Sequence, residues 1–454
     1  MIKLFAETPR DQKIIDSLSK ALKKKDEKIE KLEKELEEYR KRHPATVGVK
    51  NGKSYEIREQ SVTVSESPGG EKRKPGAQMG HKGHFRRTPK ITERVHVKQD
   101  AFTCPECSSK LVRKGIRTRV IEDIPDIIPQ TIQYRIQRLY CKKCRRIYEP
   151  DMPEALPNAR LSIRTMLIAA YLKTGMRMSL ESVSTTMKEI FGIRISEGEI
   201  QQILYQLSDS LGHEYNNLLE TIRKAPSRHM DTTSWRQNGI NRALWVFVTR
   251  GEAIFHVANS NNHEVAMEML GEHSGTDIHD RFSAFDTLAS KSHNQQQFCW
   301  SHIICDAKEL ESFYGQEGAR IKKHLQQIYK EAKSFHGKGS AEDVDDLHHK
   351  LVFLLDTDYE HDRSRKFVEN LLKRKKEWLF RFVVDPEVEP TNNRAERALR
   401  PAVIYRKTLG GSRSDRGSEA YERLHSIFYT EKIRKESIIK HVPEMIKRKV
   451  PHPG

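Results

Sequence analysis

Residues 228–258, RHMDTTSWRQNGINRALWVFVTRGEAIFHVA, contain three short runs rich in β-forming residues. The runs are Arg228–Trp235, Arg242–Arg250 and Ala253–Ala258. Short stretches that contain glycine separate them, which is the pattern of consecutive strands in one sheet. The stretch therefore predicts three strands of a sheet near the middle of the chain.

The residues that follow extend this pattern. The next elements are expected in the order helix, strand, strand, helix, at His263–Leu270, Gly275–Asp280, Gln297–Ser301 and His302–Leu310. Three strands, a helix, a strand and a further helix is the order of an RNase H-like α/β sheet. We therefore predict an RNase H-like catalytic domain over residues 226–430, with a helical insertion at about 307–385 and a C-terminal tail at 431–454.

Two carboxylates lie where this sheet can bring them together. Asp231 is inside the first strand among apolar and hydroxyl side chains, and Asp280 ends the fourth strand. A buried carboxylate is costly unless it is paired or binds a metal. Two such acids on adjacent parallel strands, joined by a third acid from a helix, can hold two Mg²⁺ ions about 4 Å apart.

The third acid is expected from residues 391–400, TNNRAERALR. If this segment is a helix, one face carries four polar residues, Asn393, Glu396, Arg397 and Arg400. The opposite face keeps Ala395, Ala398 and Leu399 for packing. Glu396 can then point at the metals while Arg397 and Arg400 meet phosphate. The basic, glycine-containing stretch that follows suits contact with a DNA backbone through Arg406, Lys407 and Arg413.

Other acids compete for these roles. Asp286 lies six residues after Asp280, but it follows a helix-like FSAF and is interpreted as a surface or capping residue. A further acidic group is formed by Asp356, Asp358, Glu360 and Asp362. It lies in the charged helical stretch and is interpreted as a solvated face.

Two Cys-x-x-Cys pairs, Cys104-Pro-Glu-Cys107 and Cys141-Lys-Lys-Cys144, are separated by 33 residues. Four thiolates at this spacing can converge tetrahedrally on one Zn²⁺ ion, which would stabilise a small polar segment. Both pairs lie in polar loops without a thioredoxin-like pattern, so a structural zinc is preferred over redox chemistry. We predict one zinc-binding domain over residues 101–155.

Residues 156–225 are expected to be helical. A helix over Ser179–Ile190, a turn with Gly192 and a helix over Ser196–Leu211 form a helix-turn-helix pattern. Ser196 and Glu199 have the spacing of a capping box at the start of the second helix. Gln201, Gln202 and Tyr205 are then candidates to face DNA bases. An ordinary helical hairpin fits the pattern equally well.

The first 43 residues have a heptad pattern. Its seam positions are Ile15, Leu18, Leu22, Lys25, Ile29, Leu32, Leu36 and Tyr39. Lys and Glu occupy most other positions, which favours a coiled coil that pairs two subunits over a solvated single helix. Residues 44–100 lack a period and are rich in glycine, proline and basic side chains. They predict an extended arm whose Lys82, Arg86 and Arg87 contact DNA, or a solubilising linker.

Composition agrees with a multidomain, DNA-associated protein. The chain has 454 residues and a formal net charge of +18, and such an excess favours a polyanionic partner. Six cysteines are too few for a disulfide scaffold. The N-terminal residues have no apolar signal core, and no stretch is apolar enough to cross a membrane, so a cytoplasmic location is expected.

A family resemblance follows from particular strings. Residues 389–417, EPTNNRAERALRPAVIYRKTLGGSRSDRG, resemble the signature of the insertion-sequence sixty-six (IS66) transposases. Four other strings resemble motifs of that family: GAQMGHKGH at 76–84, DTTSW at 231–235, HDRFSAFD at 279–286 and CWSHIICDAKEL at 299–310. The resemblance covers almost the whole chain.

The resemblance implies a DDE transposase on an RNase H-like fold. Its catalytic triad falls on Asp231, Asp280 and Glu396, and Cys299 and His302 match a C-x-x-H element that is interpreted as structural or supportive rather than as a zinc site. The implied cofactors are two Mg²⁺ or Mn²⁺ ions per active site, beside one structural Zn²⁺. The implied partners are the terminal inverted repeats of the element, target DNA, a second copy of the chain and accessory transposition proteins. The implied location is the prokaryotic nucleoid.

Two alternative functions remain open. One is a DNA-binding regulator that keeps the zinc and helix-turn-helix segments with a degenerate nuclease domain. The other is an RNase H-like nuclease that cuts DNA without joining it.

Overall fold

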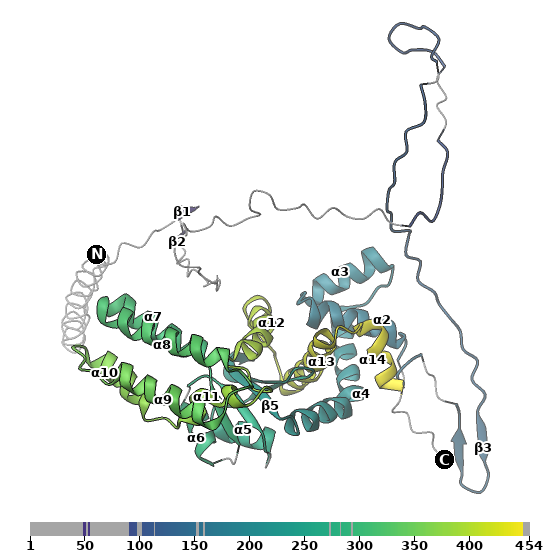
Figure 1. Ribbon diagram of the computed structural model, residues 1–454. Helices are drawn as coiled ribbons and strands as arrows, with labels where there is room; N and C mark the ends of the chain where they lie inside the picture. The colour runs from purple at the N-terminus through teal and green to yellow at the C-terminus, as the bar shows by residue number, and fades with distance from the viewer. Residues whose placement is uncertain are drawn as a thin grey trace, which may run out of the picture. The chain divides into compact units, whose positions relative to one another are not determined.

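The computed structural model describes residues 49–50, 53–54, 90–97, 102–112, 114–150, 154–157, 159–271, 274–281, 283–291 and 294–447 (Figure 1). It divides into two units, Met1–Glu122 and Asp123–Gly454. The predicted coiled-coil helix and the arm residues Lys82, Arg86 and Arg87 lie outside the described residues. Within the first unit, β1 (Val49–Lys50) pairs antiparallel with β2 (Lys53–Ser54).

One five-stranded mixed sheet forms the centre of the second unit. Its strands are β5 (Ser227–Gln237), β6 (Ile240–Val248), β7 (Ala253–Ala258), β8 (Thr276–His279) and β9 (Gln295–Phe298). The spatial order is β7-β6-β5-β8-β9, with β5, β6 and β7 antiparallel in sequence and β8 and β9 parallel to β5. The first three strands and the fourth therefore match the sequence-based prediction to within a few residues.

The fifth strand lies earlier than predicted. The sequence analysis expected it at Gln297–Ser301, but β9 is Gln295–Phe298 and the next helix, α7 (Trp300–Tyr314), has already begun at Trp300. This polar strand can lie inside the protein because its amide side chains form hydrogen bonds there. Gln296 Oε1 lies 2.7 Å from His279 Nε2, and Gln297 Oε1 accepts the Phe382 N–H at 3.0 Å.

Helices on one face of the sheet share a large core with it. These helices are α2 (Ile163–Ala170), the π-helical turn η1 (Tyr171–Gly175), α3 (Leu180–Phe191), α4 (Glu197–Arg223), α5 (His263–Leu270), α6 (Ser283–Lys291), α13 (Asp415–Arg434) and α14 (Ile438–Lys447). Alternate residues of β6, such as Trp245 and Phe247, join this core. Residues on both sides of Pro226 thus contribute to one hydrophobic core.

The opposite face of the sheet carries α12 (Asn393–Leu409). The other set of alternating β6 residues, Leu244, Val246 and Val248, packs there with Ala395, Ala398 and Leu399 of α12. These three helix residues are the ones that the sequence analysis assigned to packing. The period of two along β6 explains why one strand can serve both cores.

Helix α13 covers the outer edge of the sheet at β7. Backbone N–H groups of Ala253, Phe255 and Val257 donate to Thr430 Oγ1 (3.0 Å), Ser426 Oγ (2.9 Å) and Glu422 Oε1 (2.9 Å), respectively. Two residues along a strand and four residues along a helix both advance roughly 6–7 Å, so the spacing of the N–H donors on β7 matches the spacing of the side-chain acceptors on α13. The match removes a free strand edge that could pair with another chain.

The predicted helical insertion, which lies between β9 and α12 in the sequence, forms a separate layer of helices. It contains α7, α8 (Gln316–Ser334), α9 (Ala341–Leu355), α10 (Asp362–Leu372) and α11 (Lys376–Val384). These helices have their own core, which also includes Ile278 of β8 and Phe298 of β9. The insertion is therefore joined to the sheet at the strands that end beside Asp280.

Two helical segments differ from the sequence-based predictions. Helix α4 continues to Arg223 instead of ending at Leu211, because Tyr215, Leu218 and Ile222 continue its buried face. The expected C-terminal tail is helical up to Lys447, with Val442 and Ile446 of α14 in the core. Among the described helices, none is long and apolar enough to cross a membrane.

Candidate active site

Asp231 and Asp280 are brought level by the pairing of β5 with β8. The parallel register pairs Ser227 with Thr276 and His229 with Ile278, which is an offset of 276 − 227 = 49 positions. The same offset links residue 231 with residue 280, just beyond the last paired residues. The two carboxylates therefore come from neighbouring positions, Asp231 within β5 and Asp280 directly after the end of β8.

Asp231 is half-buried within β5, and its Oδ1 accepts the N–H of Thr232 at 2.7 Å. Its pKa is raised to about 7, mainly by burial and further by the negative charges of Asp280 and Glu396, against the opposing effects of the Thr232 N–H and of His302. Asp280 and Glu396 are thus near enough to Asp231 to raise its pKa, although the three carboxylates are not among the described groups with ligand atoms within 4.8 Å of one another. A carboxylate in such surroundings is readily held ionised by a bound cation.

Glu396 reaches this site from the first turn of α12. It is half-buried, and its Oε1 lies 3.7 Å from Nδ1 of His302 on α7. The buried alanine face of α12 holds the helix against β5 and β6, so the polar face carrying Glu396 is directed away from that core. The sequence-based assignment of the two faces of this helix is confirmed.

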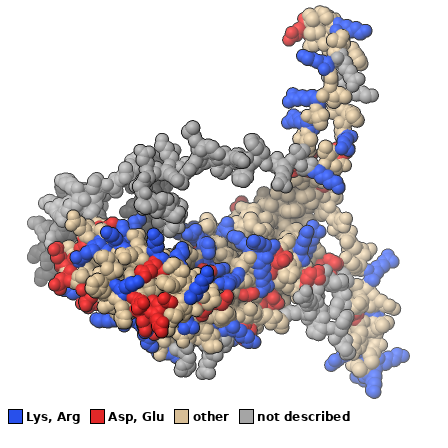
Figure 2. Space-filling view, viewed as in Figure 1, with Lys and Arg blue, Asp and Glu red and all other residues tan. Residues whose placement is uncertain are grey.

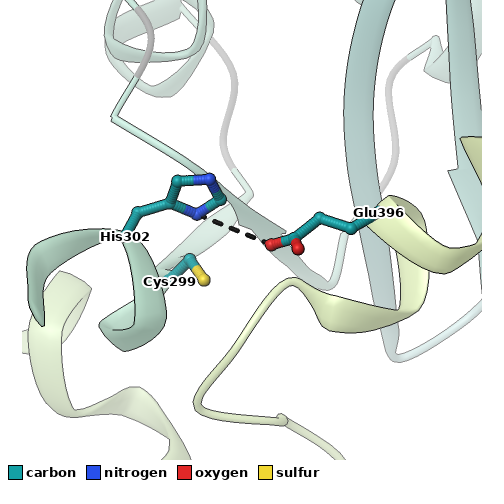
Figure 3. A group of neighbouring side chains, drawn as sticks. All are labelled: Cys299, His302 and Glu396. Atoms are coloured by element: carbon teal, nitrogen blue, oxygen red, sulfur yellow. Dashed lines mark ion pairs between the residues drawn. The ribbon is translucent and has the colours of Figure 1, made fainter. Parts of the chain in front are cut away.

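Cys299 and His302 lie beside Glu396 (Figure 3). One ligand atom from each of Cys299, His302 and Glu396 lies within 4.8 Å of the others, the one such group of three found among the described residues. The pKa of His302 is raised to about 9, mainly by the adjacent Cys299 side chain and further by the carboxylates of Glu396 and Asp280. A protonated imidazole here partly balances the negative charge of the acids.

Cys299 connects the end of β8 with the start of α12 through hydrogen bonds of its backbone and its sulfur. It is fully buried, and its N–H donates to the carbonyl of His279 at 2.9 Å. Its Sγ accepts the N–H of Asn392 at 3.0 Å. The Cys299 sulfur is buried and already accepts a hydrogen bond, which supports the interpretation that the C-x-x-H element is structural. In addition, Mg²⁺ prefers oxygen ligands to sulfur.

Asn392 was missed as a site residue by the sequence analysis. It is fully buried at the N-terminus of α12, where its carbonyl accepts the N–H of Glu396 at 3.2 Å. Its Nδ2 donates to the carbonyl of Met230 at 2.7 Å. Met230 precedes Asp231, as His279 precedes Asp280, so Asn392 and Cys299 together tie the three acid-bearing elements. The only sequence signal was the polar pair Asn392-Asn393 before an apolar helix face.

Comparison with protein-family models matches residues 160–420 to the family described as Transposase IS66 family. The chain belongs to the IS66 transposase family. The matched range begins before α2 and ends within α13, so it includes the sheet, the insertion and all three acids. No curated protein matches the chain in sequence. Membership in the IS66 family indicates a transposase that binds DNA and uses divalent metal ions.

The acids that competed for the triad have other surroundings in this IS66 transposase. Asp286 lies on α6, and its Oδ2 accepts a hydrogen bond from Arg374 of the insertion at 2.6 Å. The second acidic group is exposed, and Asp362 within it pairs with Arg365 at 2.8 Å. Both observations support the interpretation of these residues as surface or structural acids.

The basic residues predicted to contact DNA differ in their surroundings. Arg397, Arg400, Lys407 and Arg413 are exposed. Arg406 is half-buried and hydrogen-bonds to the backbone and side chain of Ser234 on β5. Arg406 is therefore partly engaged in holding α12 against the sheet.

The predicted base-reading residues lie near the start of α4. Gln202 is exposed, whereas Gln201 is half-buried and lines a cavity together with residues of α13. The ring of Tyr205 is covered by the guanidinium of Arg416, 4.5 Å from its centre. The apolar side of α4 faces the core shared with α2 and α13.

Both Cys-x-x-Cys pairs of the IS66 chain form knuckle-like turns. In the first unit, the N–H of Cys104 donates to Ser109 O at 2.8 Å. In the second unit, β3 (Leu139–Cys141) and β4 (Arg146–Tyr148) form a hairpin around Cys144, whose N–H donates to Cys141 Sγ at 3.4 Å. The residue after each second cysteine has a positive φ, 57° at Ser108 and 53° at Arg145. Because the pairs belong to different units, a shared Cys₄ site stays a prediction.

The electrostatics of these turns suit metal-binding thiolates. The pKa of Cys141 is lowered, first by the backbone N–H of Cys144. The pKa of Cys107 is lowered as well, first by the hydroxyl of Ser109. Hydrogen bonds to sulfur favour the thiolate, which is the form that binds zinc.

Proposed function

We propose that this IS66 family member is a DDE transposase that cleaves DNA at the ends of its insertion sequence and joins the freed ends to target DNA. One observation carries the proposal: the parallel register of β5 and β8 sets Asp280 level with Asp231, and Asn392, four residues before Glu396, hydrogen-bonds to Met230 beside Asp231. Three acids from β5, the end of β8 and α12 therefore serve one site. The order of the elements supports an RNase H-like catalytic domain, because three consecutive strands are followed by a helix, a strand and a further helix; this further helix, α6, lies between β8 and β9, where the sequence analysis expected none.

The donor set suits hard divalent cations. Asp231, Asp280 and Glu396 would hold two Mg²⁺ or Mn²⁺ ions, which activate the attacking oxygen and stabilise the leaving oxygen when bound. The pKa of Asp231 is raised mainly by burial and to a lesser extent by the nearby carboxylates, and a bound cation would favour its ionised form. His302 contributes positive charge beside Glu396, and Asn392 and Cys299 fix the backbone from which the acids project.

The reaction needs no covalent protein–DNA intermediate. A water molecule attacks the phosphodiester at the element's end and leaves a 3′-OH. The same site then aligns that 3′-OH for in-line attack on a target phosphate. Arg397 and Arg400, exposed on α12 beyond Glu396, would hold the DNA backbone during both steps.

The remaining segments are proposed to recognise and pair the two ends. The basic arm, the Cys₄ zinc domain and the α3–α4 helices, including Gln202, would bind the terminal inverted repeats. The heptad segment would join two copies of the chain, so that both ends are processed together. Figure 2 shows Lys and Arg side chains across the visible surface, with Asp and Glu among them. Accessory proteins and a location on the nucleoid are part of the same proposal.

The test is a strand-transfer assay with labelled end DNA, unlabelled target DNA and Mg²⁺. We expect both cleaved ends and products in which the labelled 3′ end is joined to target. Cleavage without joined products would favour the nuclease alternative. Specific binding without metal-dependent cleavage would favour the regulator with a degenerate nuclease domain.

The zinc proposal gives a separate prediction. Cys141→Ser should lower both the thermal stability of the protein and its affinity for end DNA, because a structural zinc stabilises the domain that it folds. A zinc-replete sample should contain about one Zn²⁺ per chain, measured by elemental analysis. Cys305→Ser is the matched control, since Cys305 is exposed on α7. Unchanged zinc content and DNA affinity in Cys141→Ser would contradict the prediction.

A further inference from the structure

A cavity of about 320 Å³ is lined by residues of η1, α3, α4, β5, α12 and α13. Its volume is within the range of small-ligand pockets. Its apolar wall consists of Trp235, Tyr405 and Tyr421, whose rings pack together with the centroids of Trp235 and Tyr421 at 4.6 Å. Neither the proposed triad nor the zinc turns contribute to it.

Lys173 lines this cavity and is 8 % exposed. Its ammonium lies 5.0 Å from the centre of the Tyr405 ring, and it has no hydrogen bond or ion pair with any described residue. Burial lowers the pKa of Lys173 to about 8. A largely buried lysine whose ammonium has only an aromatic neighbour is stabilised in its charged form when an anion accompanies it. The π-helical turn that carries Lys173 is a rare backbone feature that occurs often at functional sites.

Tyr421 supplies a second unsatisfied donor to the same cavity. Its hydroxyl is buried, and it has no hydrogen-bond partner in the described part of the chain. Buried hydroxyl groups are nearly always hydrogen-bonded, so an occupant with oxygen acceptors would remove the deficit. The cavity wall thus contains one buried hydroxyl without a hydrogen-bond partner among the described residues and one ammonium whose neighbour is the Tyr405 ring.

The first turns of three helices line the cavity as well. They are represented by Leu180 of α3, Glu197 of α4 and Gly417 of α13. Serine side chains cap all three helices, so the helix dipoles, rather than free N–H groups, make these termini favourable for anions. The carboxylates of Glu181 and Glu197 also line the cavity, but both residues are exposed, whereas Lys173 is buried.

We propose that this cavity is a binding site for a phosphate group, with Lys173 and the Tyr421 hydroxyl as its buried donors. The loop after α12 adds Ser412 and Arg413 to the wall, and it belongs to the stretch that composition assigned to DNA backbone contact. A phosphodiester of bound DNA is therefore one source of the phosphate, and free inorganic phosphate is the other. Only the DNA source rests on the proposed function.

The experiment measures thermal unfolding of the full chain with increasing inorganic phosphate, at constant ionic strength. A ligand that binds the folded state raises the unfolding midpoint. We expect phosphate to bind Lys173→Met roughly ten- to a hundredfold more weakly than the parent, because a charge-assisted hydrogen bond is lost. Tyr421→Phe should show a smaller loss in the same direction.

Matched controls come from α13. Lys432 also lies over a tyrosine ring, at 5.7 Å from the centre of Tyr429, but neither residue lines the cavity. Lys432→Met and Tyr429→Phe should respond to phosphate like the parent. If Lys173→Met is more stable than the parent and both respond equally to phosphate, Lys173 is only a buried lysine and the proposal is wrong.

A second arm identifies the source of the phosphate. Short oligothymidylate is compared with the same oligomer carrying uncharged methylphosphonate linkages, on the parent, Lys173→Met and Lys432→Met proteins. A phosphodiester-dependent shift that Lys173→Met loses supports the site with DNA as the source. A shift with inorganic phosphate alone supports it with free phosphate, and no Lys173-dependent shift in either arm overturns it. None of these readouts uses cleavage, so failure of the proposed transposition reaction would not affect them.

Discussion

Asp231→Asn, Asp280→Asn and Glu396→Gln should each reduce metal-dependent cleavage and joining by at least about a thousandfold. Each amide keeps the shape of the side chain and removes the charge that a metal ion needs. Because the three acids act as a unit, losing one should cost nearly as much as losing all. The measurement is the rate of cleavage and strand transfer on labelled end DNA. Specific end binding, followed by gel shift, should stay near that of the parent.

The most informative comparison is Asp280 with Asp286. The parallel register sets residue 280 level with residue 231, whereas Asp286 pairs with Arg374. Asp286→Asn and the exposed Asp356→Asn should therefore remain active. An inactive Asp286→Asn protein beside a fully active Asp280→Asn protein would show that the second acid has been assigned six residues too early.

Metal specificity should follow the same site. Mn²⁺ should replace Mg²⁺, because both accept compact octahedral oxygen coordination. Ca²⁺ should allow DNA binding without turnover, since it takes more ligands at longer distances. Turnover in Ca²⁺ at the Mg²⁺ rate would contradict the two-metal assignment.

Arg228→Met should lower the free energy of unfolding by about 3–5 kcal/mol, the largest stability change that we expect from one substitution in the sheet. Arg228 on β5 and Asp277 on β8 are both fully buried, with Nε and Oδ1 2.6 Å apart. Asn294 donates to the other carboxylate oxygen at 3.0 Å. Removing the guanidinium leaves a buried carboxylate without its main partner. Urea unfolding, followed by fluorescence of the buried tryptophans, measures the change.

Two further variants separate the buried pair from an ordinary ion pair. Arg250→Met removes an exposed partner of Glu387, at 3.1 Å, and should cost less than about 1 kcal/mol. The double variant Arg228→Met with Asp277→Leu should recover much of the loss, because no unpaired charge remains. If Arg228→Met costs no more than Arg250→Met, the buried pair is not important for stability.

Local sequence patterns predicted much of the catalytic unit. The bounds of β7 and α5 agree with the predictions, and the alanine face of α12 packs as expected. These elements depend on interactions within a few residues or on a simple period of two or 3.6, so the sequence contains their signal. The pattern of α4 also continued beyond Leu211 through Tyr215, Leu218 and Ile222, and the longer helix could have been found from it.

The fifth strand shows where local patterns fail. QQQF has no alternation of apolar residues, yet it forms β9 because Gln297 is satisfied by the backbone of α11, which lies 82–85 residues later in the chain. The same holds for Asn392, whose partners Met230 and Cys299 are more than 90 residues away. No local period reports such contacts. The coiled coil, the zinc domain and the helix-turn-helix stay predictions.

The sequence by itself determined the order and type of most elements, the carboxylates available to the site and, through its motifs, the IS66 family. Only the tertiary structure decided which of those acids lie near one another. The pairing of β5 with β8 and the buried contacts of Asn392 and Cys299 bring the backbone segments that carry Asp231, Asp280 and Glu396 together, while Arg374 engages Asp286. The physical reason is that an acid's chemical role depends on the charges and burial around it, and residues far apart in the chain supply both.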